Sequence, residues 1–340
     1  MIFERMASLS KKLISEKIDR IYRPVSAEME QMEQRLDHFF DDEPRDLIRQ
    51  ASAYLPQAGG KRIRPALVML FARSTGMFDT EYDYITASSA VELIHNATLI
   101  HDDVVDEAEL RRGVATVNEE WDNKTAVLVG DYLYSRALDE IEQLGKNRVV
   151  GELTRATRSM SRGELISLSD QRAVDVSREQ YFEIIDHKTA SLMSAACFLG
   201  TAGSSGDYEE SARDYGRYFG RAFQIVDDIM DLLSDSDTAG KTAFKDLEKG
   251  KLTLPVIEAV QSSENGSQRE IETIMSDGLT LGERRNRLLP IIRETNGFAR
   301  AGETAQKYAQ KASDALRDFP DNDATESLRL MCEYVVKRNF

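Results

Sequence analysis

Apolar residues recur along most of the chain at the three-to-four-residue spacing of amphipathic helices. Alternating β-branched runs and Asn-Gly turns, which indicate β-hairpins, are almost absent. The pattern therefore predicts an all-α fold. We expect helices at 24–41, 44–55, 64–75, 80–106, 118–143, 147–169, 178–202, 207–234, 254–264, 281–295, 297–318 and 322–338.

The helical pattern runs without a fixed-period repeat or a low-complexity linker. The chain has 340 residues, 41% of them hydrophobic, which is enough for a large core. We therefore expect a single domain over residues 1–340. Even the apolar stretch 191–203 falls short of the roughly 18 residues that a membrane span needs. Residues 1–23 mix charges and lack the apolar region of a signal peptide.

Composition narrows the classes of function. The net charge of -15, with no block rich in Lys and Arg, argues against nucleic acid as a partner. Cys197 and Cys332 are too few for a disulfide framework and lie in apolar helical contexts. We therefore expect a cytoplasmic protein.

An acidic row, His101-Asp102-Asp103-Val104-Val105-Asp106, ends one predicted helix. Residues four apart are neighbours on a helix, so Asp102 and Asp106 share a face, with Asp103 about 100° away. Such carboxylates repel one another unless a cation lies between them, and Mg²⁺ prefers oxygen ligands of this kind. A single acidic row is more often only a solvated helix face.

A second acidic row, Asp227-Asp228-Ile229-Met230-Asp231, has the same spacing and also follows an apolar helical segment. Two such rows make the solvated-face interpretation much weaker and predict a clamp of several metal ions for a polyphosphate. Gln224 lies one turn before Asp227, so its amide could bond a bridging oxygen or present a dipole to a cation.

Basic residues cluster at two further places. Gly59-Gly60-Lys61-Arg62-Ile63-Arg64-Pro65 puts three cations at a predicted helix start, where they repel the helix dipole unless an anion compensates. Arg111 and Arg112 point in different directions and could each hold a phosphate. His95 lies two turns before Asp102; a lone helical His is more often a satisfied polar residue, and the alternative is a phosphate donor.

More cations lie near apolar segments and near the second acidic row. Lys188 and Thr189 stand at the edge of the apolar run, and Lys241, Lys245, Lys249 and Lys251 follow the second row. Cations beside a carboxylate clamp are what a departing diphosphate requires. Together these features predict ionisation of an allylic diphosphate in a dry pocket, with a second diphosphate substrate held at the basic site.

These motifs, in this order from Gly59 to Pro255, resemble those of trans-polyprenyl diphosphate synthases. They also include Gly130-Asp131, Phe223-Gln224 and Gly250-Lys251-Leu252-Thr253-Leu254-Pro255. The resemblance implies a helical bundle around a deep central cavity, the isoprenoid synthase fold. It also implies a homodimer that adds isopentenyl diphosphate units to an allylic primer, with three Mg²⁺ ions per site.

The resemblance also implies roles for single residues. Those implied to bind isopentenyl diphosphate are Lys61, Arg64, His95 and Arg112. Those implied to face the allylic diphosphate are Arg111, Lys188, Thr189, Gln224 and Lys241, the last four as catalytic residues. The implied metal ligands are Asp102, Asp106 and Asp227, with Asp103, Asp228 and Asp231 completing the rows. Phe244 departs from the Gly that is common in the family loop after Lys241.

Product length depends on the helix below the first acidic row. Ala97 and Thr98, about one turn deeper, are small where short-chain members of the family carry an aromatic floor, and Ile94 lies further down. The run 96–101 is similar to that of long-chain synthases that make quinone side chains. We therefore expect a product of about thirty carbons or more, which Ala97→Phe should shorten.

Three alternatives stay open. A geranylgeranyl or farnesyl diphosphate synthase would differ only in where other helices block the tunnel. A class I terpene cyclase also has an acidic row, but its second row normally mixes Asn, Ser and Glu. A non-catalytic partner subunit would be expected to have lost motif residues, which this chain retains.

The C-terminal cations have two possible roles: Lys337 and Arg338 could reach over the site or cap the last helix.

Overall fold

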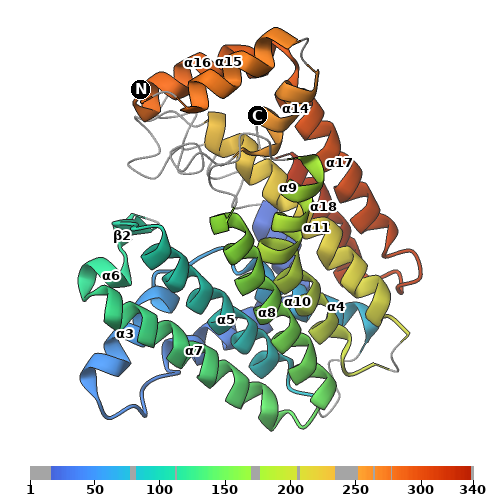
Figure 1. The fold of residues 1–340 in the computed structure, drawn as a ribbon. Helices are drawn as coiled ribbons and strands as arrows, with labels where there is room; N and C mark the ends of the chain where they lie inside the picture. The colour runs from blue at the N-terminus through green and yellow to red at the C-terminus, as the bar shows by residue number, and fades with distance from the viewer. Residues whose placement is uncertain are drawn as a thin grey trace, which may run out of the picture.

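The computed structural model describes residues 17–76, 82–111, 113–169, 177–204, 207–233, 252–262, 265–276 and 278–337. These residues are almost entirely helical, which confirms the all-α prediction (Figure 1). The helices are η1 (Arg23–Val25), α2 (Ser26–Asp37), α3 (Asp46–Gln57), α4 (Ile63–Thr75), α5 (Tyr84–Val105), α6 (Val117–Glu120), α7 (Asn123–Gln143), α8 (Asn147–Ser169), α9 (Arg178–Ile185), the π-helix η2 (Asp186–Ala190), α10 (Ser191–Thr201), α11 (Glu209–Leu233), α14 (Leu254–Ser262), α15 (Asn265–Ser276), α16 (Leu281–Glu294), α17 (Gly297–Asp314) and α18 (Asp323–Val336).

Local chemistry explains where the structure departs from the predicted helices. The helix expected at 118–143 is divided into α6 and α7, because the Asp122 carboxylate accepts a hydrogen bond from the Thr125 N–H and caps α7. Helix α15 was not predicted. The short hairpin of β1 (Leu110–Arg111) and β2 (Val114–Ala115) was not predicted either. Lys337 caps α18 and its ammonium group donates to Glu333.

Helix α10 is the centre of the bundle, because it packs against α4, α5, α8 and α11. Two glycines permit its closest approaches. A Cβ at Gly200 of α10 would overlap the Val68 carbonyl of α4, and one at Gly216 of α11 would overlap the Ser194 backbone of α10. Helices α5 and α11 lie on either side and are backed by α7 and α17 respectively (Figure 1). This packing places the two helices with acidic rows around one interior.

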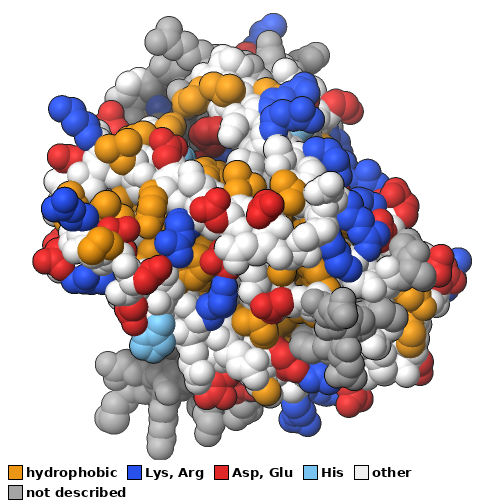
Figure 2. All heavy atoms as spheres, turned by 90° about the horizontal axis from the view of Figure 1, so that it is seen from below, with side chains coloured by type: hydrophobic (Ala, Val, Ile, Leu, Met, Phe, Trp, Pro, Cys, Tyr) orange, Lys and Arg blue, Asp and Glu red, His pale blue; other side chains and the backbone are white. Residues whose placement is uncertain are grey.

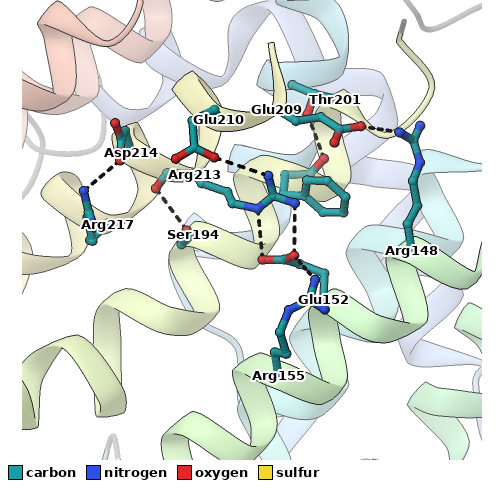
Figure 3. Close-up of polar contacts among 11 residues, drawn as sticks. Arg148, Glu152, Arg155, Ser194, Thr201, Glu209, Glu210, Arg213, Asp214 and Arg217 are labelled. Carbon is teal, nitrogen blue, oxygen red and sulfur yellow. Dashed lines mark hydrogen bonds and ion pairs between the residues drawn. The ribbon is translucent and has the colours of Figure 1, made fainter. Parts of the chain in front are cut away.

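A polar network ties α8, α10 and α11 together (Figure 3). The Arg213 guanidinium lies 4.1 Å from the centroid of the Phe198 ring and donates to both carboxylate oxygens of Glu152, at 3.3 and 3.2 Å. The Arg213 carbonyl accepts a hydrogen bond of 3.0 Å from the Ser194 hydroxyl. These contacts fix the relative positions of the three helices.

Charged side chains of both signs reach the surface of the described residues (Figure 2). On the face in Figure 2, acidic, basic and apolar side chains all appear, and several Lys and Arg side chains lie near one another on the right-hand side of the view. Within the described ranges, no helix is long and apolar enough to cross a membrane.

Candidate active site

A cavity of about 1010 Å³ lies among α5, α8, η2, α11 and the start of α4. The α5 side chains that line it recur every three or four residues, so they occupy one side of that helix. They are Glu92, His95, Thr98, Leu99, Asp102 and Val105, with His101 at the edge.

The two acidic rows meet at this cavity, because Asp102 of α5 and Asp227 of α11 both line it. Burial raises the pKa of Asp102 above its usual range; Lys188 and Arg111 oppose this shift, and Glu164 adds to it. A nearby cation stabilises the charged form of a buried carboxylate of this kind more than it stabilises a solvated carboxylate. Asp106 and Asp231, at the last positions of the rows, are half-buried.

Asp103 faces away from its neighbours in the first row, as the helical spacing predicted. It is 2% exposed, and its Oδ2 accepts a hydrogen bond of 2.7 Å from the Arg111 Nε. The hairpin after α5 therefore turns Arg111 back towards the row, where it also lines the cavity. Within the described part of the chain, Oδ1 of Asp103 has no hydrogen-bond partner. Arg112 lies outside the described residues.

Asp228, the corresponding residue of the second row, is 4% exposed, and protein groups hold both of its oxygens. Oδ2 accepts from the Tyr181 hydroxyl at 2.6 Å, and Oδ1 accepts from the Gln224 amide at 2.8 Å. The expectation that Asp228 completes the metal-ligand row stays a prediction; the structure adds that its buried carboxylate accepts hydrogen bonds from two side chains. Tyr181 was not identified from the sequence.

The residues present fit a divalent cation chemically. Hard carboxylate oxygens from two helices face one cavity, and the unpaired Oδ1 of Asp103 lies in the first row. In the described ranges, no three acidic, histidine or cysteine side chains already converge as a metal site.

A second group of cations lines the same cavity, from the start of α4. It consists of Lys61 and Arg64, and the Arg64 Nη1 lies 3.1 Å from the His95 Nε2 of α5. The structure thus brings together three of the four residues expected to bind isopentenyl diphosphate; Arg112 is the fourth.

Arg62, between those two cations, has a structural role. Its backbone is left-handed, with φ 48°, and its side chain is 5% exposed. The guanidinium donates to Glu92 at 2.8 Å, to Glu33 and to the Pro56 carbonyl at 2.7 Å. All three cations around this helix start line the cavity, but the Arg62 guanidinium is held by protein groups and fixes the loop.

Lys188 and Thr189 reach the cavity from the π-helix η2, where a continuous helix was predicted. Two glycines make room for this wider turn. A Cβ at Gly163 of α8 would lie 2.7 Å from the His187 Cβ, and one at Gly220 of α11 would lie 2.6 Å from the Ala190 Cα. Such π-segments are frequent at functional sites.

An ion pair with Arg221 of α11 holds the start of η2. The Arg221 guanidinium pairs with the Asp186 carboxylate and donates to the Tyr308 hydroxyl at 3.0 Å. Tyr308 belongs to α17, so the C-terminal helices support the turn that carries Lys188.

Glu164 of α8 is a cavity residue that was not identified from the sequence. It pairs with Lys188, one of the cations expected to face the allylic diphosphate. The available signal was an acid among the apolar residues Met160, Leu165 and Leu168 of one helix face. Lys241, the other such cation, lies outside the described residues with Lys245, Lys249, Lys251 and Phe244.

The residues expected to control chain length occupy different depths. Thr98 lines the cavity, whereas Ala97 and Ile94 are completely buried and are absent from its lining. His101, one turn after Ala97, lies 3.0 Å from the Val127 carbonyl of α7. Ala97 therefore lies in the packed core and not at the cavity wall.

Comparisons with known proteins agree with this architecture. The sequence profile of the polyprenyl synthetase family matches residues 45–287. The chain is 36% identical over 298 residues to the octaprenyl diphosphate synthase of Escherichia coli strain K12, covering 86% of this chain and 90% of that protein. It is 35% identical over 326 residues to heptaprenyl diphosphate synthase component 2 of Geobacillus stearothermophilus, covering 95% and 100%. A solved polyprenyl synthase from Caulobacter crescentus CB15, complexed with calcium and isoprenyl diphosphate, has a TM-score of 0.87 and 34% identity, covering 95% of this chain and 98% of that one.

Proposed function

The chain belongs to the polyprenyl synthetase family and is a trans-prenyltransferase, and we propose that it condenses isopentenyl diphosphate with an allylic diphosphate primer. The product is a long-chain all-trans polyprenyl diphosphate of the kind used for quinone side chains. One observation carries the proposal: Asp102, Asp227 and Lys188 line the same cavity as a separate cationic group of Lys61, Arg64 and His95. Two diphosphates can therefore bind side by side.

In the proposed reaction, the allylic carbon–oxygen bond breaks and its electron pair leaves with the diphosphate. Arg111, Lys188 and Lys241 would neutralise the departing group, and oxygens of Thr189 and Gln224 would face the carbocation. The double bond of isopentenyl diphosphate then supplies the electrons of the new carbon–carbon bond. The departed diphosphate takes up the proton whose loss restores a double bond. Lys61, Arg64, His95 and Arg112 would hold this second substrate.

We propose Mg²⁺ as the cofactor, with Asp102, Asp106, Asp227 and Asp231 as the ligands that face the substrate and Asp103 as an inner member of the first row. Three ions per site follow from the family resemblance. The calcium bound to the Caulobacter relative supports a divalent ion at this kind of site. When bound, the ions would neutralise charge on the departing diphosphate.

The long product rests on two arguments. The relatives are named octaprenyl and heptaprenyl diphosphate synthases. On α5, two side chains lie at the cavity wall one turn below Asp102, and neither is aromatic: the small Thr98 and Leu99. The alternative is a shorter product, geranylgeranyl or farnesyl diphosphate, which the product sizing described next would reveal.

Product sizing tests the proposal. The full chain is incubated with Mg²⁺, farnesyl diphosphate and isopentenyl diphosphate, and the products are separated by chromatography after removal of the diphosphate. We expect a linear polyprenyl product of about thirty carbons or more, and no turnover when a chelator removes the Mg²⁺. A cyclic hydrocarbon would instead support a terpene cyclase.

One relative favours a second candidate function. Heptaprenyl diphosphate synthase component 2 carries the name of one component of an enzyme, so this chain could act as a partner subunit. The test is turnover by the purified chain alone. Activity without another protein excludes a non-catalytic partner, and inactivity of a folded, Mg²⁺-loaded chain supports one.

We propose a single-domain homodimer. One domain is supported because Tyr308 packs against both apolar clusters of the core. Exposed apolar side chains outside the cavity lining support the dimer: they are Val127, Leu128 and Leu138 of α7. Sedimentation of the wild-type chain and of Leu128→Asp measures the oligomeric state and so tests the association.

We propose the cytoplasm as the location, because Cys197 and Cys332 are free, buried thiols.

A further inference from the structure

We propose that Tyr181 of α9 is a positioning residue for the chemical step. It acts through Asp228 to aim the amide oxygen of Gln224 and the hydroxyl oxygen of Thr189 at the allylic carbocation. This inference rests on the proposed function and adds a residue that the sequence motifs do not contain.

Four side chains form one hydrogen-bonded series from the interior to the cavity. The Tyr181 hydroxyl donates to Oδ2 of Asp228 at 2.6 Å, and the Gln224 Nε2 donates to Oδ1 at 2.8 Å. The Thr189 hydroxyl donates to the Gln224 Oε1 at 2.7 Å. Tyr181 and Asp228 are 5% and 4% exposed, whereas Thr189 and Gln224 line the cavity.

The series fixes which end of each dipole faces the substrate. A carboxylate only accepts hydrogen bonds, so the NH₂ group of Gln224 must point towards Asp228. Its Oε1 is then turned towards η2, where it takes the Thr189 proton. The remaining lone pairs of both oxygens are available to the cavity, and these are the negative ends that stabilise a developing cation.

Tyr181 keeps Asp228 in this role. With the hydroxyl bound to Oδ2 and the amide to Oδ1, both oxygens are held in one orientation by buried hydrogen bonds, and rotation of the carboxylate would break them. The capping box of Ser177 and Gln180 fixes where α9 begins. It thereby fixes the position of Tyr181, which lies one turn after Ser177. The hydroxyl therefore reaches Asp228 from a fixed helix.

The experiment compares Tyr181→Phe with Tyr215→Phe. Each change removes one buried tyrosine hydroxyl, but the Tyr215 hydroxyl donates to the Leu328 carbonyl at 2.7 Å and Tyr215 does not line the cavity. For both variants we measure melting temperature, kcat and KM for each substrate, and the Mg²⁺ concentration at half-maximal rate. We also measure the affinity for an ammonium analogue whose nitrogen replaces the cationic carbon, and for its neutral isostere.

We expect Tyr181→Phe to lower kcat by about tenfold and to weaken binding of the ammonium analogue by a similar factor. KM, the Mg²⁺ requirement and binding of the neutral isostere should stay within about twofold of wild type. Tyr215→Phe should lower the melting temperature without these changes.

Equal weakening of the cationic and neutral analogues would overturn the proposal, since the hydroxyl would then only support packing. A raised Mg²⁺ requirement with unchanged analogue binding would also overturn it, because Asp228 would then act on the metal. Turnover by the wild-type protein distinguishes failure of the proposed function from failure of this inference. An inactive wild type overturns both. An active wild type whose kcat does not change in Tyr181→Phe overturns only the role of Tyr181.

Discussion

A Cβ added at Gly220 would lie 2.6 Å from the Ala190 Cα, at the end of the π-helix η2. Real Cβ atoms do not come this close to backbone, so η2 must shift in Gly220→Ala. We expect a loss of about 1–3 kcal/mol in the free energy of unfolding and a lower kcat, because Lys188 and Thr189 move with η2. Denaturant unfolding and steady-state kinetics measure the two effects.

Gly302→Ala is the matched control for that substitution. Gly302 lies inside α17, and a Cβ there meets no heavy atom within 4 Å. This variant should be more stable by about 0.5–1 kcal/mol and keep wild-type kinetics. If Gly220→Ala and Gly302→Ala have the same free energy of unfolding and the same kcat, the close contact between Gly220 and η2 affects neither stability nor turnover.

Arg62→Met should act on stability. It removes the cation that pairs with Glu92, whose side chain is 3% exposed, and thus leaves a buried charge uncompensated. We expect a loss of about 3–5 kcal/mol, measured by urea unfolding. Arg49→Met, at the exposed pair with Asp46, should change stability by less than about 1 kcal/mol. A stable Arg62→Met protein would contradict the structural role.

Arg64→Gln should act on binding instead. Arg64 lines the cavity beside His95, and loss of a charged hydrogen bond costs about 1.5–3 kcal/mol. KM for isopentenyl diphosphate should therefore rise by about 10- to 100-fold, with KM for the allylic primer nearly unchanged. If both KM values rise together, Arg64 does not separate the two substrates.

Thr98→Phe should shorten the product, because Thr98 lines the cavity and an aromatic ring there fills the path of the growing chain. Product sizing by chromatography measures the change. Ala97→Phe is the informative comparison: Ala97 is fully buried, so its ring should cost about 1–3 kcal/mol of stability through overpacking. Shortening by Ala97→Phe alone would place the tunnel at Ala97 and not at Thr98.

Glu164→Gln should tighten diphosphate binding. Glu164 pairs with Lys188 at the cavity, so a diphosphate that binds Lys188 must displace the Glu164 carboxylate and is then repelled by it. Without this charge, affinity for inorganic diphosphate with Mg²⁺ should rise by about three- to tenfold, as measured by calorimetry. Glu183→Gln removes an exposed acid paired with Arg162 and should leave the affinity unchanged. Weaker binding in Glu164→Gln would assign Glu164 to the metal site.

Much of the fold follows from periodicity, which predicted the long helices and placed Asp102 and Asp227 on the faces that line the cavity. Spacing also predicted that Asp103 would face elsewhere. Helix α15 escaped prediction because its short amphipathic segment has no strong apolar run. The π-helix escaped because nothing local distinguishes it from α-helix. Its cause is the close approach of Gly163 and Gly220 from two other helices.

The missed site residues share a physical reason. Tyr181 and Glu164 act through partners distant in sequence, Asp228 and Lys188, and such pairs depend on how helices pack. Arg62 carries the same charge as Lys61 and Arg64, and only its left-handed backbone turns it inward to Glu92. Residue type predicted a cationic loop, whereas the backbone conformation determined that the Arg62 side chain turns to Glu92.

The glycines beside α10 limit how this enzyme family member can change. Gly200 and Gly216 bring backbone against backbone on two sides of α10, so no layer of side chains separates α4, α10 and α11 there. Substitutions can therefore resize the cavity through its lining side chains without altering how closely α11, which carries the second acidic row, packs on α10. Product length can evolve separately from the geometry of diphosphate activation.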